Sequence, residues 1–190
     1  MKVKKKKNMP EELNPVKDYL FNYIKKSTTI TKLISEKKFD VIINEIVENC
    51  YDKVIVMDEK EEALGILATG ILHYLLTNAL LNSQRKVEHR GLKLDIVIPD
   101  VKTLEKDPKM TLLILIPKSS DQKIIDEKIT KLKKIQSIKE NIWVVLSKEI
   151  SLDCKSFILS KESSSFSKII FEIGQFSNVG KSTKFKILRI

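Results

Sequence analysis

The chain contains little cysteine, glycine or proline. Its 190 residues include two cysteines, five glycines and five prolines. Cys50 and Cys154 lie far apart and match no metal-ligand spacing, and a pair of lone cysteines is typical of a reducing compartment. The sequence therefore predicts a cytoplasmic protein without a cysteine-based zinc cluster, and the scarcity of glycine and proline predicts long regular elements.

The sequence also lacks the signatures of several enzyme classes. No Ser-His-Asp arrangement and no dinucleotide-binding fingerprint is recognisable. Residues 174–183, GQFSNVGKST, are similar to a phosphate-binding P-loop, but they have five residues before Gly-Lys where the motif has four. The final KFKILRI predicts a strand, whereas a P-loop opens into a helix whose first amides hold the phosphate. These features argue against nucleotide hydrolysis.

One long uncharged run raises the question of a membrane span. Residues 63–83 carry no formal charge, but Gly65, Thr69 and His73 are among the residues that interrupt the run, and no second span exists. No signal peptide is recognisable either, because the basic start is followed by Asn, Met, Pro and acids. We therefore expect a buried core helix and no membrane partner.

Positive charge is concentrated at the two ends of the chain. The formal net charge is +10; residues 1–10 hold five lysines and no acid, and residues 151–190 hold seven Lys/Arg and three acids. Such ends suit nucleic acid, DNA rather than RNA, although a solvated lysine tail has the same composition. The aromatic residues form no strand-borne platform for stacked bases. The candidate nucleic-acid contacts are Lys4, Lys5, Lys6, Lys7, Arg90, Lys181 and Lys184.

The first third of the chain predicts a disordered tail followed by helices. Residues 1–14 cannot form a packed core, and Asn14 and Pro15 are typical of a helix start. A second amphipathic helix is expected over residues 39–49 and a short strand over residues 53–57, KVIVM. The secondary structure of residues 28–35 is ambiguous. Taken together, residues 15–57 are expected to form a helical segment packed on the core.

Residues 58–150 predict an α/β core. Asp58 and Glu61 have the spacing of a capping box before the long helix of residues 59–82. Strands are expected over residues 84–90, in a hairpin within residues 89–118, and over the apolar residues 142–146. A lysine-rich amphipathic helix, capped by Ser119 or Ser120, is expected between the hairpin and the strand of residues 142–146. Residues 151–190 predict further strands of the same domain, at residues 156–159, 168–173 and 184–190.

An acid and a lysine in the hairpin are the strongest chemical signal. Alternation predicts that Leu92, Leu94, Ile96 and Ile98 share one face of the first strand and Lys93, Asp95 and Val97 the other. In the second strand Met110, Leu112, Ile114, Ile116 and Lys118 share a face. An acid such as Asp95 within an apolar strand is costly unless something binds it.

These residues resemble the PD-(D/E)XK nuclease superfamily, which has the restriction endonuclease-like fold. Its signature is an acid in a strand, a hairpin, and acid-x-lysine at the end of the next strand. Asp95 takes the place of the first acid and Lys118 that of the lysine, while Ile116 stands where the second acid should be. Asp100, in a literal Pro-Asp, is a competing first acid. The order helix-strand-strand-strand-helix-strand from residue 58 also resembles the superfamily core, a central mixed sheet flanked by helices.

The resemblance implies a divalent metal, Mg²⁺, between carboxylates and the scissile phosphate. Asp95 and Lys118 would be catalytic, and the metal ligands would be Asp95 with Glu62 or Glu61 from the preceding helix and Glu88 from the preceding strand. The carbonyl of Pro117 is a further candidate. The acid missing at Ile116 means either that Glu127 or Asp121 substitutes for it or that the site does not cut.

Each of these residues also has a possible structural role without catalysis. Asp95 could form a structural ion pair with Lys118 or Arg90, and Lys118 could be an ordinary strand-end lysine. His73 matches the helix histidine of one exonuclease branch only loosely, so we expect a buried, hydrogen-bonded histidine, whereas His89 is expected on the surface. Three functions stay open: a metal-dependent endonuclease, a non-cutting binding or assembly subunit of the same fold, and a protein-interaction module. A homodimer is compatible with the sequence.

Overall fold

The computed structural model describes residues 14–185, with side chains described through residue 178. This part of the chain contains seven α-helices, five strands and three single 3-10 turns. In chain order the elements are α1 (Pro15–Lys26), α2 (Thr28–Ser35), α3 (Phe39–Val54), α4 (Lys60–Asn78), β1 (Gln84–His89), β2 (Leu92–Ile98), α5 (Val101–Lys106), η1 (Pro108–Met110), β3 (Leu112–Leu115), α6 (Gln122–Lys133), η2 (Lys139–Asn141), β4 (Ile142–Leu146), β5 (Lys155–Ile158), η3 (Phe166–Lys168) and α7 (Ile169–Phe185).

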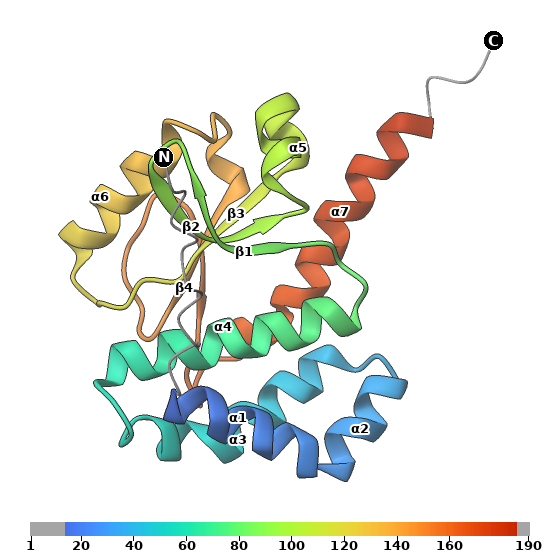
Figure 1. Cartoon of the computed structure of the whole chain (residues 1–190), viewed down its shortest axis with the longest axis vertical. Helices are drawn as coiled ribbons and strands as arrows, with labels where there is room; N and C mark the ends of the chain where they lie inside the picture. Colours follow the sequence, from blue (N-terminus) through green and yellow to red (C-terminus); the bar gives the residue numbers. More distant parts are fainter. Residues whose placement is uncertain (1–13, 186–190) are drawn as a thin grey trace, which may run out of the picture.

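The strands form one open, mixed sheet in the order β1-β2-β3-β4-β5 (Figure 1). Strand β2 is antiparallel to both of its neighbours, β1 and β3, whereas β3, β4 and β5 are parallel. Arg90 and Gly91 alone connect β1 to β2, and both have positive φ, 49° and 74°, as a two-residue hairpin turn requires. The α/β class expected from the sequence is therefore confirmed.

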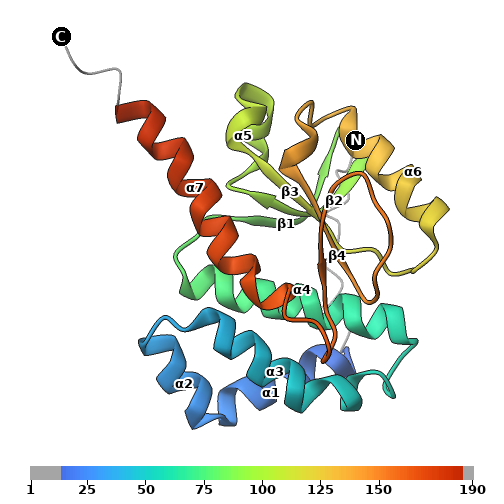
Figure 2. The ribbon, with the colours of Figure 1, turned by 180° about the vertical axis from the view of Figure 1, so that it is seen from behind.

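The sheet separates two apolar cores. One face, with Ile96 and Ile114 among its residues, packs against α4, α7 and, beyond α4, the first three helices. The other face, with Leu113 and Val144 among its residues, packs against α5 and α6. Figures 1 and 2 show these two groups of helices on opposite sides of the sheet.

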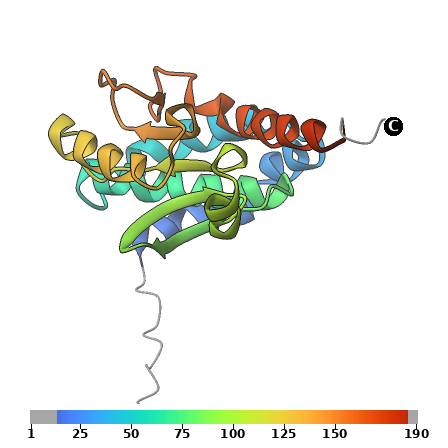
Figure 3. The ribbon, with the colours of Figure 1, turned by 90° about the horizontal axis from the view of Figure 1, so that it is seen from above.

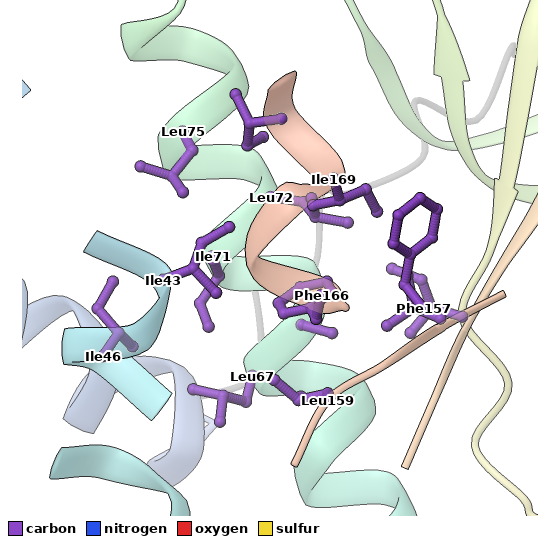
Figure 4. Close-up of a cluster of buried hydrophobic side chains, with 14 of the residues drawn as sticks. Ile43, Ile46, Leu67, Ile71, Leu72, Leu75, Phe157, Leu159, Phe166 and Ile169 are labelled. Atoms are coloured by element: carbon purple, nitrogen blue, oxygen red, sulfur yellow. The ribbon is translucent and has the colours of Figure 1, made fainter. Parts of the chain in front are cut away.

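Helix α4 is the buried core helix predicted from the uncharged run. Ten of its residues are buried, and the partly exposed face includes Ile66, Thr69 and His73. Figure 4 shows Leu67, Ile71 and Leu72 of α4 between side chains of α3, β5 and α7. Within the described residues, no helix is both long and apolar enough to cross a membrane.

Helix α1 has a side-chain cap and lies in close contact with α4. The Asn14 side chain accepts a hydrogen bond from the Lys17 N–H at 3.0 Å, so the predicted start of α1 is confirmed. A Cβ added at Gly70 of α4 would lie 2.5 Å from a methyl carbon of Leu20 in α1. Only glycine allows α1 to approach α4 at this point.

Two local predictions in this region are wrong. Residues 53–57 are not a strand, because α3 continues to Val54 and buries Cys50 and Val54 on its apolar face. Asp58 is not the cap of α4: Glu59 precedes the helix without a side-chain cap, and the Asp58 carboxylate accepts from the neighbouring Glu59 N–H at 2.8 Å.

The cap expected for α6 is also corrected. The Asp121 side chain, rather than Ser119 or Ser120, accepts hydrogen bonds from the N–H groups of Lys123 and Ile124 at the start of that helix.

The C-terminal region differs most from the sequence-based prediction. Strand β5 confirms the strand expected at residues 156–159, but α7 replaces the strand expected at residues 168–173 and includes residues 184 and 185. Phe166, Ile169, Ile170 and Ile173 are buried against the core at helical spacing, which explains the helix. The P-loop-like residues 174–183 are therefore helical, and α7 runs past the edge of the sheet (Figure 3). Residues 186–190 lie outside the described residues.

Candidate functional site

The candidate site begins where β2 and β3 stop pairing. Ile96 pairs with Ile114, but the ladder does not continue to Asp95. Instead, Oδ2 of Asp95 accepts a hydrogen bond from the backbone N–H of Ile116 at 2.8 Å. The carboxylate thus takes the place of a carbonyl on the neighbouring strand and satisfies a half-buried amide. This contact fixes the acid between the two strands.

The alternation of β2 is interrupted at the same residue. Leu94 belongs to the core beneath α6, whereas Ile96 belongs to the core beneath α4, although the two residues were predicted to share a face. On the neighbouring strand Lys86 has a φ of 49°, which is unusual for a side chain other than glycine. The predicted face of β3 is confirmed for Leu112, Ile114 and Ile116.

The environment of Asp95 makes ionisation of its carboxyl group less favourable than in water. Burial raises the pKa of the carboxyl group above its usual range. The hydrogen bond from Ile116 and the positive charges of Lys128, Lys118 and Lys86 oppose that rise without reversing it. Among the described residues Asp95 forms no ion pair with Lys118 or Arg90, and its carboxylate instead accepts from the main chain.

A cavity of about 350 Å³, here called the Asp95 cavity, opens beside this carboxylate. Helices α1 and α4, strands β1 and β2 and the chain after β3 form its walls. Its cationic lining residues are Lys17, Arg85, Lys86 and Lys118. Its remaining lining residues are Phe21, Gly65, Ile66, Thr69, Gly70, Asp95 and Ile116. The two residues expected to carry the chemistry, Asp95 and Lys118, therefore line one cavity.

Lys118 is paired with an acid that the sequence had also singled out. Its ammonium group forms an ion pair with Oε1 of Glu62 in the first turn of α4, and both side chains are partly exposed. The neighbouring Glu61 accepts a hydrogen bond from the Ser120 hydroxyl at 3.4 Å. Glu62 thus reaches the cavity only through its contact with the lysine.

Other predicted residues lie elsewhere. Glu88 is exposed on β1, opposite Lys93, and does not line the Asp95 cavity. Arg90 occupies the hairpin turn and does not line it either. The competing acid Asp100 caps α5 by accepting from the Thr103 N–H at 2.8 Å. Residues 1–13 and the side chains of Lys181 and Lys184 lie outside the described part of the chain. The predicted nucleic-acid contacts that fall there are Lys4, Lys5, Lys6, Lys7, Lys181 and Lys184.

The carboxylates required for a protein-held Mg²⁺ do not gather here. Ile116 lines the cavity at the position of the second acid, and of the proposed substitutes Asp121 caps α6 while Glu127 is exposed on that helix. Within the described part of the chain, no three His, Cys, Asp or Glu side chains are grouped to hold a metal ion. Among residues 14–178, whose side chains are described, Asp95 is the one acid that lines the cavity, beside four cationic residues, and this set fits an anion better than a cation.

Neither histidine lies at the Asp95 cavity. His73 of α4 is half-buried and lines a separate hollow with Thr77 and Arg85. His89 was expected at the surface but is buried, with its Nδ1 3.7 Å from the Glu105 carboxylate.

The lining residues that the sequence did not indicate include three cations and one aromatic side chain. Lys17 and Phe21 are one turn apart on α1, and Arg85 and Lys86 are adjacent on β1. Nothing in the spacing of the hairpin indicates that α1 closes over it. The available signal was the pair Arg85-Lys86 on the strand preceding Asp95.

Protein-family models, curated proteins and solved structures were all compared with the chain, and none of them matches it.

Proposed function

We propose that this protein binds nucleic acid through the phosphate backbone at the Asp95 cavity. The observation that carries the proposal is the clustering of Lys17, Arg85, Lys86 and Lys118 around one cavity. Cations gathered in a hollow attract phosphate more strongly than the same charges scattered over a surface. Lys86 and Lys118 are both exposed, so a strand at the mouth of the cavity can reach them.

The lysine-rich start of the chain supports the same partner. Lys17 lines the cavity from the first turns of α1, so the chain enters the described fold beside this site. Lys7 precedes Asn14 by seven residues, and seven residues span at most about 25 Å. This length is only an upper limit on the reach of Lys7 from Asn14, so the lysines of residues 4–7 support the proposal through their charge alone.

A nuclease-like fold is part of the proposal. The elements α4, β1, β2, β3, α6 and β4 follow the helix-strand-strand-strand-helix-strand order of the superfamily core, with α5 and η1 added before β3. Asp95 and Lys118 have the corresponding places around the hairpin. The residue at the second acid position is Ile116, so the geometry supports binding without cutting better than it supports cleavage.

Salt-dependent binding tests the proposal. We expect Lys86→Gln with Lys118→Gln to weaken binding of a labelled DNA duplex. The slope of log affinity against log salt should become shallower by about 0.9 for each phosphate that the variant no longer neutralises. The control is Lys131→Gln with Lys134→Gln, which removes the same charge from exposed positions at the end of α6, on the opposite face of the sheet. Equal effects of the two pairs would overturn the proposal.

A Mg²⁺-dependent DNA endonuclease is the second candidate. It is favoured by one observation, that the Asp95 carboxylate and the Lys118 side chain line the same cavity. Supercoiled plasmid incubated with and without Mg²⁺ tests it, with Asp95→Asn and Lys118→Gln as the variants. Nicking that needs Mg²⁺ and is lost in both variants would establish cleavage, whereas nicking unaffected by either variant would reject this site.

A further inference from the structure

The size of the Asp95 cavity limits what can enter it. Its volume of about 350 Å³ is that of a small-molecule site. A B-form duplex keeps its bases stacked between two backbones and offers grooves up to about 12 Å wide, so a paired base cannot reach the interior. A nucleotide outside the stack is not restricted in this way, because its base is free to leave the strand axis.

The lining of the cavity includes one aromatic ring and two isoleucine side chains. Phe21 lies one helical turn after Lys17 on α1 and is half-buried. Ile66 and Ile116 line the same cavity. On α4, Gly65 lies against the chain after β3, because an added Cβ would be 3.7 Å from the Pro117 carbonyl oxygen and 3.8 Å from an Ile116 methyl carbon. An aromatic ring and aliphatic side chains in the lining of one cavity suit the face of a base.

The acid at the cavity demands a ligand that brings donors as well as negative charge. An ionised carboxylate only accepts hydrogen bonds, and one oxygen of Asp95 already accepts from the Ile116 N–H. A phosphate directed at this group would be repelled. A base offers N–H groups to the carboxylate, in the way that acidic side chains accept from the amino group of cytosine.

We propose that the Asp95 cavity takes one unpaired nucleotide of a nucleic-acid strand. Its base lies against Phe21 and donates to the carboxylate of Asp95, and its phosphate lies beside Lys86 and Lys118. This inference rests on the proposed function and adds a preference for single strands over duplex. A nucleotide pocket and a phosphate-only site also differ in the change of binding affinity that they predict when Asp95 is substituted.

The hydrogen bond that the Ile116 N–H donates to Asp95 decides whether Asp95→Asn weakens or strengthens binding. In Asp95→Asn the amide has one oxygen, and the half-buried Ile116 N–H requires it. An NH₂ group then faces the cavity, where it meets the donors of a base. The variant should therefore weaken binding of a single strand. At a phosphate-only site the same variant removes a repelling charge and should strengthen binding.

Phe21 provides the second test. Phe21→Leu keeps an apolar side chain in the core but removes the flat ring, and Phe171→Leu on α7 is the matched control because that ring is 66% exposed and does not line the cavity. We measure binding of a labelled single-stranded DNA, the RNA of the same sequence, and the DNA duplex by fluorescence anisotropy. Phe21→Leu should weaken single-strand binding by about 5- to 100-fold. Phe171→Leu and duplex binding should show no such loss.

The outcomes separate this inference from the proposed function. Equal affinity for single strand and duplex, or single-strand binding unaffected by Phe21→Leu or strengthened by Asp95→Asn, overturns the nucleotide pocket while leaving the phosphate site standing. Binding that is unchanged by the loss of Lys86 and Lys118 overturns both. A thermal melt of each variant before the titration confirms that it is folded. Comparison of the affinities for the single-stranded DNA and the RNA of the same sequence distinguishes a site that contacts the sugar from one that contacts the base alone.

Discussion

Oδ2 of Asp95 lies 2.8 Å from the backbone nitrogen of Ile116, and this contact bridges β2 and β3 where their ladder ends. The acid therefore has a structural role even without a ligand. Any functional account of Asp95 has to separate the loss of this hydrogen bond from the loss of its charge.

Two substitutions of Asp95 make that separation. Asp95→Ala leaves the Ile116 N–H without its partner and should lower the free energy of unfolding by about 1–3 kcal/mol. Asp95→Asn keeps an oxygen in place and should avoid that loss. Urea denaturation of both variants checks this difference. Equal destabilisation would mean that charge, and not the hydrogen bond, is what the fold requires.

The same residue predicts a pH dependence of stability. Burial raises the pKa of Asp95 in the folded chain above the unfolded value of about 3.9. Its ionisation therefore costs stability: the cost is absent below the unfolded pKa, grows as the pH rises through it, and is complete above the folded pKa. Asp95→Asn removes the cost, so its melting temperature should exceed that of the wild type more at pH 7 than at pH 3.5. A gain that is larger at the lower pH would contradict the burial argument.

The contact between α1 and α4 is tested at two glycines of one helix. A Cβ at Gly70 would lie 2.5 Å from the fully buried Leu20, and Gly70→Ala should cost about 1–3 kcal/mol through overpacking. At Gly65 the nearest atom would be 3.7 Å away, and Gly65→Ala should be neutral or stabilising by up to about 1 kcal/mol because alanine favours the helix. Calorimetric melts of the two variants decide the point; a stable Gly70→Ala variant would show that the helices can separate at little cost.

The Glu62–Lys118 ion pair should restrain nucleic-acid binding. Both partners are partly exposed, so Glu62→Gln should change stability by less than about 1 kcal/mol. It should strengthen binding by a few-fold, because the lysine is released and a negative charge beside the cavity is lost. Glu88→Gln on β1 removes the same charge from an exposed position outside the cavity and serves as the control. Equal gains in affinity from the two variants would assign the effect to net charge alone.

The two cysteines should differ in their reaction with thiol reagents. Burial, with a smaller contribution from Glu45, raises the pKa of the Cys50 thiol to about 12, and its side chain is not exposed. In a Cys154→Ser variant, Cys50 should react with a thiol reagent only under denaturing conditions. Fast labelling of the native protein would show that α3 opens readily from the core.

The long, strongly patterned elements could be predicted from the sequence. The start of α1 at Asn14, the buried helix α4 and the parallel strand β4 follow from a cap residue, an uncharged run and a short apolar run. Such signals are local, so they survive without knowledge of the tertiary structure.

The errors lie where a short apolar run fits more than one element. The residues around Ile169 and Ile173 contain adjacent isoleucines, which suit a strand as well as a helix. Only the position of α4 beneath them selects the helix. The place of Asp95 between two strands was also beyond local reasoning, because alternation assigns every side chain to one face or the other. The place of Phe21 at the cavity depends on how α1 packs on α4, which no spacing within either helix encodes.

Strand β1 forms one border of the sheet, and its composition affects how the protein behaves at high concentration. Arg85, Lys86 and Glu88 put charge along this border, and the left-handed backbone at Lys86 bends it. A bent, charged border is a poor template for the strand of a neighbouring molecule. We therefore expect that residues 84–89 do not seed fibrils, and that any self-association uses another part of the surface.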